Sequence, residues 1–354
     1  MREPAVPAQI VLLFGLPRSG TTWLAKLFDS HPDVLYRHEP DIVHRGGHLP
    51  DWPALEPDAA LLAEARRYLD LLLATRTLKT SGSRPVFSQK NYRSRLASHL
   101  RAALIHGVRA LEQVGAGPLT RRLPIPDGIA AADWARVTLV LKSVSSPTRL
   151  GLFARALPGC RVIFTIRHPC GQVASMRRGE QLGAFEEAFD HDWLLAGEEA
   201  QAHGLEPAMF QRLPILEQLA WQWVILNERA VADVARLPAA RIVRHADLAR
   251  APRAGARELL AFAGLSLTPA TETFIRESTE YDGEGRYYQV FRNAAAEIDK
   301  WRHELSAEEQ ARILAIARRS RLVALWPELT APEHGCAFSP APADGHAGEG
   351  AIGD

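Results

Sequence analysis

The 354-residue chain lacks long apolar stretches and has few cysteines. It contains no run of about eighteen uncharged apolar residues, the length that a bilayer requires, so we expect no membrane span. The apolar run at residues 10–16 is too short for the core of a usual signal peptide, and no charged segment of the usual kind precedes it. The three cysteines, Cys160, Cys170 and Cys336, have neither metal-binding nor disulfide spacing. These absences favour a cytoplasmic location.

The chain also lacks a large net charge of either sign. The formal net charge is +1 at pH 7, from 42 Lys and Arg against 41 Asp and Glu, so no overall attraction to nucleic acid is indicated. Lysine is scarce: it supplies five of the 42 basic residues and arginine supplies the rest. We therefore interpret an arginine only where it lies within a motif. The 47% hydrophobic and 23% charged residues are typical of a globular protein, and the length suits one large α/β domain or about two smaller ones.

Apolar runs and helical patterns alternate along the chain. Short continuous apolar runs predict buried parallel strands, and the patterns between them predict helices. The order strand, helix, strand, helix from residue 137 onward implies a parallel pair with a right-handed crossover. The expected fold class is therefore α/β, a parallel sheet wrapped by helices. The predicted strands are 10–15, 137–141, 161–166 and 241–245; the predicted helices are 21–30, 58–74, 94–114, 147–156, 170–177, 214–236, 254–263 and 307–324; a loop is expected at 281–293.

A glycine loop lies between the first predicted strand and the first predicted helix. Gly15 to Thr22 has the glycine spacing of a Walker A loop, with Thr21 in the place of the lysine. The backbone N–H groups of such a turn, together with the helix N-terminus, bind an oxyanion whatever the side chains are. The missing lysine, and the lack of an acidic Mg²⁺ partner at the end of strand 137–141, disfavour a nucleoside triphosphatase or a P-loop kinase. A turn that only caps the helix is the alternative.

The segment from Leu16 to Trp23 resembles the 5′-phosphosulfate loop of sulfotransferases that use 3′-phosphoadenosine 5′-phosphosulfate (PAPS). Its arginine is similar to that of the carbohydrate, protein-tyrosine and many bacterial members, whereas the cytosolic branch has lysine there. The resemblance implies a P-loop-kinase-like fold with three α/β/α layers, and a loop that grips the phosphosulfate without a metal. It also implies that PAPS contacts Pro17, Arg18, Ser19, Gly20, Thr21, Thr22 and Trp23.

Two later segments resemble further nucleotide-binding elements of this family. Arg167-His168-Pro169, with Ser175 eight residues after the arginine, is similar to the 3′-phosphate motif, and arginine and serine are suited to a phosphate dianion. The segment Phe291-Arg292-Asn293-Ala294, followed by Trp301-Arg302, resembles a late loop from which Arg292 closes over the nucleotide. Phe291 stands where the family has serine, and an exposed loop beside a core tryptophan is the alternative there.

The histidine base of the cytosolic branch is absent. In that branch it lies two residues after a lysine, at the end of the strand that precedes the 3′-phosphate motif. Lys142 matches this lysine, but Val144 occupies the histidine position. We expect Lys142 and Arg18 to stabilise charge at the phosphosulfate, because ligands bind at the carboxyl ends of parallel strands in such folds. A solvent-exposed lysine at the end of a strand is the alternative.

A glutamate takes the place of this histidine. Residues 31–40 resemble the His-Pro-Asp-Val segment and following Glu-Pro of the carbohydrate and protein-tyrosine branches, which assigns Glu39 as the general base, on a loop after the first helix. His38 is a rival base. Glu39 as an ordinary loop acid, paired with Arg37 or Arg45, is a further alternative.

Three other residues receive structural roles. Asp247 is expected in a turn before helix 254–263. Trp221 and Trp223 are two residues apart and so point to different faces of their predicted helix, where core packing accounts for both.

The expected organisation is a single sulfotransferase domain at residues 1–336. Its PAPS-binding core covers about 10–45 and 137–330, and an acceptor-facing helical insert covers about 46–130. Residues 337–354 are rich in Ala, Pro and Gly without periodicity, which predicts a disordered tail.

The function predicted from the sequence is the transfer of a sulfuryl group from PAPS to a hydroxyl group of a carbohydrate or glycolipid-type acceptor. Glu39, Arg18 and Lys142 are the expected catalytic residues, and no metal is expected. The alternative acceptors are a small phenol or alcohol and a peptide tyrosine. A nucleotide-binding module without catalysis is an alternative of another class, against which Glu39 and Lys142 argue. The sequence identifies neither the acceptor nor the oligomeric state.

Overall fold

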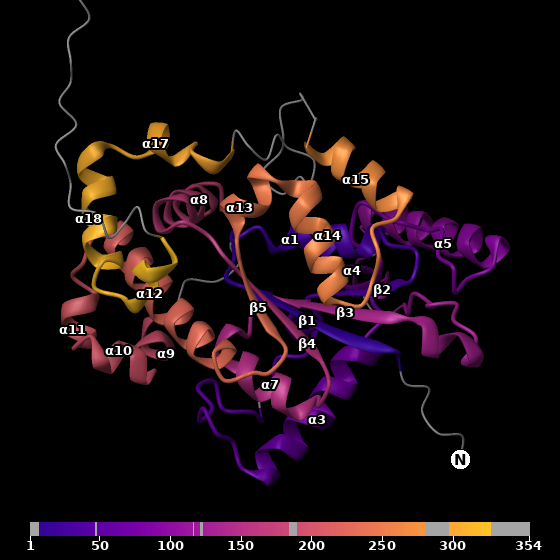
Figure 1. Cartoon of the computed structure of the whole chain (residues 1–354), viewed down its shortest axis with the longest axis horizontal. Coiled ribbons are helices and arrows are strands. Elements are labelled where there is room, and N and C mark those ends of the chain that lie inside the picture. The colour runs from indigo at the N-terminus through magenta and orange to yellow at the C-terminus, as the bar shows by residue number, and fades with distance from the viewer. Residues whose placement is uncertain are drawn as a thin grey trace, which may run out of the picture.

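The computed structural model of the chain describes residues 7–46, 48–115, 117–120, 123–183, 190–279 and 297–326. Within them, five strands form one parallel sheet in the order β2-β3-β1-β4-β5 (Figure 1). The strands are β1 (Gln9–Gly15), β2 (Val34–His38), β3 (Thr138–Ser143), β4 (Arg161–Ile166) and β5 (Ala240–Arg244). The four strands predicted from the sequence are all present, and β2 is an additional strand at one edge.

The helices are α1 (Thr21–Ser30), α2 (Pro40–Val43), α3 (Ala59–Ala74), α4 (Leu78–Ser81), α5 (Arg95–Gln113), α6 (Gly117–Thr120), α7 (Leu150–Ala156), α8 (Pro169–Gln181), α9 (His191–Leu195), α10 (Glu198–Ala202), α11 (Pro207–Phe210), α12 (Ile215–Val234), α13 (His245–Arg250), α14 (Pro252–Phe262), α15 (Pro269–Thr279), α17 (Trp301–Glu304) and α18 (Ala307–Ala317). Three 3-10 helices add η1 (Ala131–Arg136), η2 (Pro147–Arg149) and η3 (Arg321–Leu325). None of the helices among these residues is long and apolar enough to cross a membrane.

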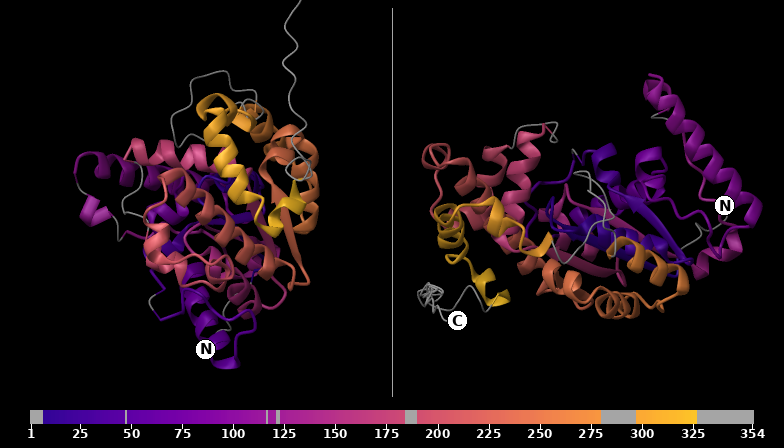
Figure 2. Two further views of the ribbon diagram at one scale, coloured as in Figure 1. Left: turned by 90° about the vertical axis from the view of Figure 1, so that its left-hand side faces the viewer. Right: turned by 90° about the horizontal axis from the view of Figure 1, so that it is seen from above.

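Helices cover both faces of the sheet. Because strand side chains alternate between the two faces, Leu12 and Phe14 of β1 enter the core that α3, α7, α8 and α12 complete, whereas Val11 and Leu13 enter the core that α1, α14 and α15 complete. Figure 2 shows the two helical layers from two further directions, with α5 projecting at one end of the molecule. The chain therefore has the three-layer α/β/α arrangement, which confirms the predicted fold class.

The strand order brings the functional motifs to one edge of the sheet. β1 lies in the centre, with β3 on one side and β4 on the other; the connection after β1 runs toward β2 and the connection after β4 runs toward β5, so the two diverge between β1 and β4. In open α/β sheets, ligands bind outside the carboxyl ends of the strands at such a divergence. The glycine loop follows β1 directly and therefore lies at this position.

Strand β2 replaces most of the loop predicted between the first helix and Glu39, whereas Glu39 itself lies between β2 and α2. Residues Val34–His38 pair in parallel with β3, with His38 opposite Lys142. Arg37 within this strand is 1% exposed, and its guanidinium donates to both carboxylate oxygens of Asp127 at 3.0 and 2.6 Å. A charged residue is buried in a strand only when a distant partner satisfies it, and nothing local to residues 34–38 indicates that partner.

Some helices also differ from the prediction, near Asp247 and near the end of the described chain most clearly. Asp247 lies within α13 rather than in a turn, and its carboxylate accepts hydrogen bonds from the Arg244 guanidinium at 2.6 and 2.9 Å. The predicted helix 307–324 ends at Ala317, and the chain restarts as η3, whose N-terminus is capped by Ser320. The helices without a prediction are α2, α4, α6, α9, α10, α11, α15 and α17. The predicted loop 281–293 and tail 337–354 lie outside the described residues.

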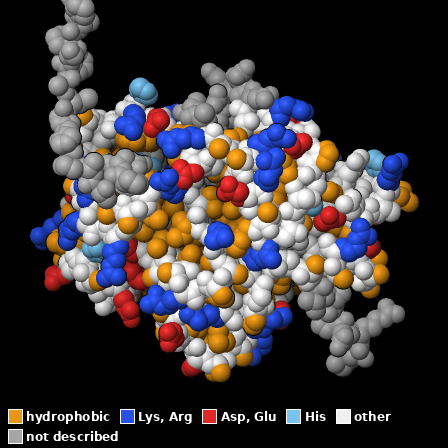
Figure 3. Space-filling model, in the orientation of Figure 1, with side chains coloured by type: hydrophobic (Ala, Val, Ile, Leu, Met, Phe, Trp, Pro, Cys, Tyr) orange, Lys and Arg blue, Asp and Glu red, His pale blue; other side chains and the backbone are white. Residues whose placement is uncertain are grey.

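Surface charge is distributed in small groups. Figure 3 shows Lys and Arg side chains interspersed with Asp and Glu side chains over one face of the molecule. Some exposed arginines of the protein form ion pairs with exposed carboxylates, such as Arg66 with Asp70 at 3.0 Å and Arg253 with Glu272. Exposed pairs of this kind contribute little to stability.

Candidate active site

The glycine loop between β1 and α1 is shaped to present backbone N–H groups. Arg18 has φ 70° and Gly20 has φ 91°, both in the left-handed region. The side chain of Ser19 is buried and donates to the carbonyl oxygen of Leu16 at 2.8 Å, which closes the turn from inside. Helix α1 starts at Thr21, and its N-cap residue, Gly20, has no side chain that could cap it. Among the residues that the structure describes, the first amides of α1 have no side-chain acceptor, as an anion-binding helix N-terminus requires.

Glycine is needed at position 20 for a second reason. A Cβ atom there would collide with the Cδ2 atom of His245, the first residue of α13 after β5. Burial, together with the charge of Arg167, lowers the pKa of His245 to about 3, so its imidazole is neutral at pH 7. The sequence analysis did not single out His245; its position directly after a predicted strand was the available signal.

The predicted 3′-phosphate motif meets the glycine loop directly. The Nε atom of Arg18 donates to Oγ of Ser175 on α8 at 3.0 Å. One Nη atom of Arg167, which follows β4, donates to the carbonyl oxygen of Arg18 at 3.1 Å. The indole of Trp223 on α12 donates to the carbonyl oxygen of Arg167 at 3.0 Å. Segments about 150 residues apart in sequence thus form one arrangement, as the sequence analysis predicted for a single nucleotide site.

The positive charge of Arg167 is not neutralised by a salt bridge among the described residues. Its other Nη atom donates to a backbone carbonyl oxygen, that of Glu297, at 3.2 Å, while the carboxylate of Glu297 pairs with Lys300. Burial lowers the pKa of Arg167 to about 10, and the nearby charge of Arg18 adds to this, so the cation persists at neutral pH. A partly buried cation of this kind is stabilised by an anion that binds beside it.

On the other side of β1, Glu39 and Lys142 form an ion pair. The ammonium group of Lys142, whose side chain is 2% exposed, contacts a carboxylate oxygen of Glu39, and the Glu39 amide donates to the Lys142 carbonyl oxygen at 2.9 Å. The same ammonium group lies 3.4 Å from the hydroxyl of Thr22 in the first turn of α1. Lys142 therefore joins Glu39 to the glycine loop, and the alternatives of an exposed lysine and of a Glu39 paired with Arg37 are wrong.

The carboxyl group of Glu39 is ionised at neutral pH. Burial, the largest single influence, would raise its pKa, but the charge of Lys142, its hydrogen bond to Glu39 and smaller contributions from neighbouring groups together hold the pKa below its ordinary value. Glu39 itself has φ 46°, a left-handed conformation that is uncommon for a residue other than glycine. Such strain is often retained where it fixes the direction of a functional side chain.

His38 lies beside Glu39 as a neutral imidazole. Burial and the charge of Lys142 lower the pKa of His38 to about 3. Its Nδ1 atom is 2.7 Å from the hydroxyl of Tyr36, whose own pKa is raised well above its usual value by burial. We assign the ring proton of His38 to Nε2, because the Tyr36 phenol donates to Nδ1. The Nε2 atom then lies 3.9 Å from the Glu39 carboxylate.

A second carboxyl group near the site, Asp41, was missed by sequence reasoning. Burial raises its pKa, and its carboxylate accepts hydrogen bonds from the hydroxyls of Ser143 and Ser146, the latter at 2.9 Å. Asp41 is the second residue of α2, two residues after Glu39, and it joins the segment after β2 to the end of β3. Its signal in the sequence was only an aspartate after Glu-Pro, which has many structural explanations.

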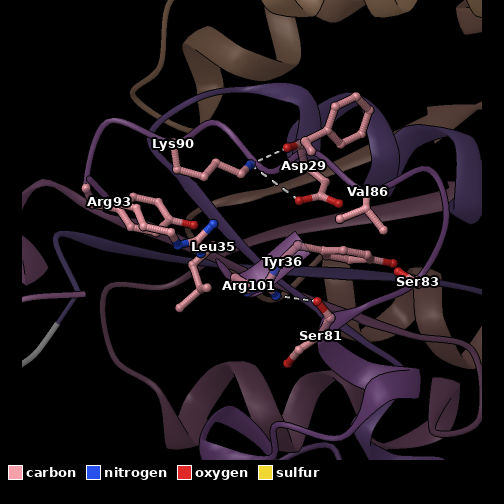
Figure 4. Close-up of a pocket in the computed structure, with 11 residues that line it drawn as sticks. Asp29, Leu35, Tyr36, Ser81, Ser83, Val86, Lys90, Arg93 and Arg101 are labelled. Atoms are coloured by element: carbon pink, nitrogen blue, oxygen red, sulfur yellow. Dashed lines mark hydrogen bonds and ion pairs between the residues drawn. The ribbon is translucent and has the colours of Figure 1, made fainter. Parts of the chain in front are cut away.

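The edge strand that carries Glu39 is supported by a buried polar network. Lys26 and Lys90 both bind the carboxylate of Asp29, at 2.8 and 3.4 Å. Figure 4 shows Lys90 reaching Asp29 beside Tyr36, and Arg101 donating to Ser81, around a cavity of about 20 Å³ that is large enough for roughly one water molecule. The ammonium group of Lys26 also lies 4.9 Å from the centre of the Tyr36 ring, so the network joins α1 to β2, the strand that precedes Glu39.

Two other predicted nucleotide contacts have separate outcomes. Trp23 is half-buried on α1, where its indole donates to Oγ of Ser278 at 2.9 Å and its ring lies 5.9 Å from that of Phe274. Arg292 lies outside the described residues. Among the residues that the structure describes, no group of three His, Cys, Asp or Glu side chains could hold a metal ion.

The chain is similar to known proteins over most of its length. A family model described as the sulfotransferase family matches residues 10–269. Carbohydrate sulfotransferase 5 of Mus musculus is 27% identical over 323 residues, which cover 85% of this chain and 78% of that protein. The Homo sapiens carbohydrate sulfotransferase 5 is 27% identical over 320 residues, or 83% of this chain and 72% of that protein.

Solved structures resemble the fold at lower similarity. The sulfotransferase domain of the Synechococcus PCC 7002 olefin synthase superposes with a TM-score of 0.46 and 16% identity, covering 90% of this chain and 96% of that domain. A sulfotransferase from Mycobacterium avium superposes with a TM-score of 0.39 and 18% identity, covering 89% of this chain and 77% of that one.

Proposed function

The chain belongs to the sulfotransferase family, and from that premise we propose that it transfers a sulfuryl group from PAPS to a hydroxyl group of a carbohydrate. The observation that carries the proposal is the meeting of two arrangements at the carboxyl edge of the sheet. Arg18, Ser175 and Arg167 form a cationic site for a nucleotide, and Glu39 with Lys142 forms an acid–base pair beside it. Catalysis by positioning and by charge stabilisation needs both.

The residues of the cationic site fit the two anionic ends of PAPS. The uncapped N-terminus of α1 and the hydroxyls of Thr21 and Thr22 suit the 5′-phosphosulfate, with Arg18 beside them. Arg167 and Ser175 suit the 3′-phosphate, because a guanidinium binds a phosphate with two parallel hydrogen bonds and a hydroxyl adds one donor. When bound, PAPS supplies a sulfuryl group on a good leaving group.

The ammonium group of Lys142 lies within reach of both Glu39 and the glycine loop. In the structure its ammonium group contacts Glu39 and also lies 3.4 Å from Thr22 of the loop. An anion at the loop attracts the ammonium group toward the loop and weakens its hold on the Glu39 carboxylate. Glu39 then becomes more basic, because the opposite charge that lowers its pKa has moved away. The same movement brings Lys142 to the charge that develops on the leaving group.

Glu39 is the proposed general base. A carboxylate that is ionised at neutral pH accepts the proton of an acceptor hydroxyl as that oxygen bonds to sulfur. A carboxylate also suits the task because transfer of this kind has a loose transition state, by analogy with phosphoryl transfer, and demands a positioned base rather than a strong one. The neighbouring His38 is less suited, because its unprotonated nitrogen, Nδ1, already accepts a hydrogen bond from the Tyr36 hydroxyl.

The carbohydrate acceptor is proposed from the relatives. Two proteins named as carbohydrate sulfotransferases match more than four-fifths of this chain, although at 27% identity. At this level of identity, the type of reaction can be inferred from the relatives more safely than the individual hydroxyl group that is modified. We therefore propose a sugar hydroxyl without naming the sugar.

The test measures release of adenosine 3′,5′-bisphosphate from PAPS in the presence of separate acceptors. The panel contains neutral and anionic oligosaccharides, a glycolipid, a simple phenol and a tyrosine peptide. We expect acceptor-dependent release with an oligosaccharide or the glycolipid, and release slowed by about 100-fold or more in the Glu39→Gln variant. Faster release with the phenol or the peptide would replace the carbohydrate acceptor, and no release with any acceptor would leave nucleotide binding alone.

A further inference from the structure

Helix α5 has two different faces. On one face Ser98, Ile105 and Val108 are buried against the domain. Two arginines on the same side reach the backbone of the segment after α4: Arg101 donates to the carbonyl oxygen of Ser81 and Arg109 to that of Gly82. This face is sufficient to hold the helix on the domain, from which it projects in Figure 2.

The opposite face of α5 is apolar and exposed. Leu96 is 69% exposed, Leu100 62%, Leu104 38% and Leu111 46%, and Val114 directly after the helix is 79% exposed. Together these fractions equal about three whole apolar side chains in water on one helix, whereas isolated exposed leucines are common and need no explanation.

The exposed face has the repeat of a helix-pairing seam. Its central line consists of Leu96, Leu100, Ala103, Gly107, Ala110 and Val114, with alternating spacings of four and three residues. This is the spacing of a and d positions in a coiled coil. The residues that flank the line carry no Asp, Glu, Lys or Arg: they are Ala97, Leu104 and Leu111 on one side and His99, His106 and Gln113 on the other.

We propose that α5 pairs antiparallel with α5 of a second copy of this chain. In an antiparallel pair each a position faces a d position of the partner. A two-fold axis that crosses the exposed line at the level of residue 105 satisfies this for the whole line. It places Leu96 opposite position 114 of the second copy and Leu100 opposite its position 110. The same axis places Ala103 opposite position 107. Large residues thus meet at the ends and small residues at the centre.

Gly107 supports a close approach at the centre of the pair. A glycine inside an exposed helix destabilises it by comparison with alanine. Nothing in the described chain lies within 4 Å of the position that a Cβ atom at Gly107 would take, so packing within one copy does not require glycine. A second backbone approaching at this point does require a small residue.

A second copy fits this face better than a lipid surface does. Helices that bind membranes flank their apolar side with Lys and Arg. In α5 two of the three arginines, Arg101 and Arg109, turn toward the domain, and only Arg95 in the first turn is exposed. An uncharged seam favours a protein partner, and a seam that is complementary to itself favours an identical one.

The test is sedimentation equilibrium of the full chain over a range of concentrations, without nucleotide or acceptor. We expect a monomer–dimer equilibrium for the unaltered chain and a dissociation constant at least about 100-fold higher for Leu100→Glu. The matched control is Leu71→Glu, which changes a leucine that is 46% exposed on α3. This control should keep the dimer, because α3 is not part of the seam.

A second variant separates pairing from misfolding. Gly107→Leu leaves the single copy undisturbed, because its Cβ has open space around it, and it should keep or raise the midpoint of thermal unfolding. The same variant should weaken the dimer, since the side chain would meet Ala103 of the second copy.

Cross-linking tests the direction of the pair. With Cys336 replaced by serine, a mixture of Ala103→Cys and Gly107→Cys chains should form the mixed disulfide faster than either chain forms its own. A monomer at all concentrations, a dimer unaffected by Leu100→Glu, or faster self-linking of Gly107→Cys would each overturn the proposal. Sedimentation of the unaltered monomer with phosphatidylcholine vesicles would assign the face to lipid instead.

Discussion

The two halves of the candidate active site treat charge differently. At the ends of β2 and β3, Glu39 and Lys142 neutralise each other. At the ends of β1 and β4, Arg167 donates to the backbone carbonyl oxygens of Arg18 and Glu297, and Arg18 donates to the Ser175 hydroxyl. Among the described residues no carboxylate forms a salt bridge with Arg167, so its two carbonyl acceptors hold the guanidinium group in place without removing its charge. We expect the first half to rearrange before it acts, whereas Arg167 can bind an anion directly.

The comparison would be sharpened most by Glu39→Gln. The amide keeps the size of the side chain but cannot accept a proton, so we expect kcat to fall roughly 10²–10⁴-fold. The affinity for adenosine 3′,5′-bisphosphate should change little, because that ligand is assigned to the other half. The matched variant His38→Gln should keep most of the rate. A dead His38→Gln enzyme beside a normal Glu39→Gln enzyme would move the base to His38.

The cationic half is tested by nucleotide selectivity. Adenosine 3′,5′-bisphosphate should bind more tightly than adenosine 5′-phosphate by on the order of 2–4 kcal/mol, since Arg167 and Ser175 bind the extra phosphate. Arg167→Gln should remove most of this difference in a calorimetric titration. Equal affinities in the unaltered protein would show that the 3′-phosphate site is misassigned.

A histidine beside each half offers a comparison by pH. His38 and His245 have pKa values of about 3 in the folded protein, against 6.5 for an unperturbed histidine. Between these values the unfolded chain binds more protons, so the stability is fully present above pH 6.5 and declines as the pH falls toward 3. Each histidine contributes a slope of about 1.4 kcal/mol per pH unit.

Urea unfolding between pH 7 and pH 4 measures these slopes. His38→Gln and His245→Gln should each make the decline shallower, by similar amounts. Saturating adenosine 3′,5′-bisphosphate should reduce the contribution of His245 to this loss of stability more than that of His38. Besides burial, the charge of Arg167 lowers the pKa of His245, and the negative charges of the nucleotide offset that charge. Unchanged slopes in both variants would mean that neither imidazole is buried in its neutral form.

The smallest expected effect is that of a chelator. Arg18 and Lys142 supply positive charge at the loop, where a metal ion would otherwise be needed, so transfer should continue in EDTA at nearly the full rate. Activity that disappears in EDTA and returns with Mg²⁺ would show that the two side chains are insufficient.

For the half that we propose to bind the nucleotide, the sequence was sufficient to predict that its motifs lie together. Its loop and its 3′-phosphate motif each follow an apolar strand and precede a helix, so local patterns indicate both the residues and their surroundings. Arg18, Ser175 and Arg167 do lie together. Their hydrogen bonds to one another were not predicted, because they depend on how β4 and α8 pack against the loop.

The structure of the other half, with Glu39 and Lys142, depends on contacts between distant segments. The strand β2 was missed because a charged residue such as Arg37 indicates a loop, and its partner Asp127, which allows it to be buried, lies 90 residues later. The pairing of Lys142 with Glu39 follows from the register of β2 against β3, and that register was unavailable while residues 34–38 were taken as a loop. A chemical role could be proposed for Glu39 by resemblance, but its partner could not.

The packing of Gly20 against His245 has a consequence for synthesis of the protein. The loop sequence is complete after about twenty residues, yet the surface against which it rests belongs to β5 and α13, more than two hundred residues later. A ribosome makes the chain from its N-terminus, and contacts of such long separation form late. A nascent chain that ends before residue 240 therefore has the loop residues without β5 and α13, against which the loop packs. Nucleotides can assist folding only after these two elements have been translated, so they would act on the finished chain rather than on its early intermediates.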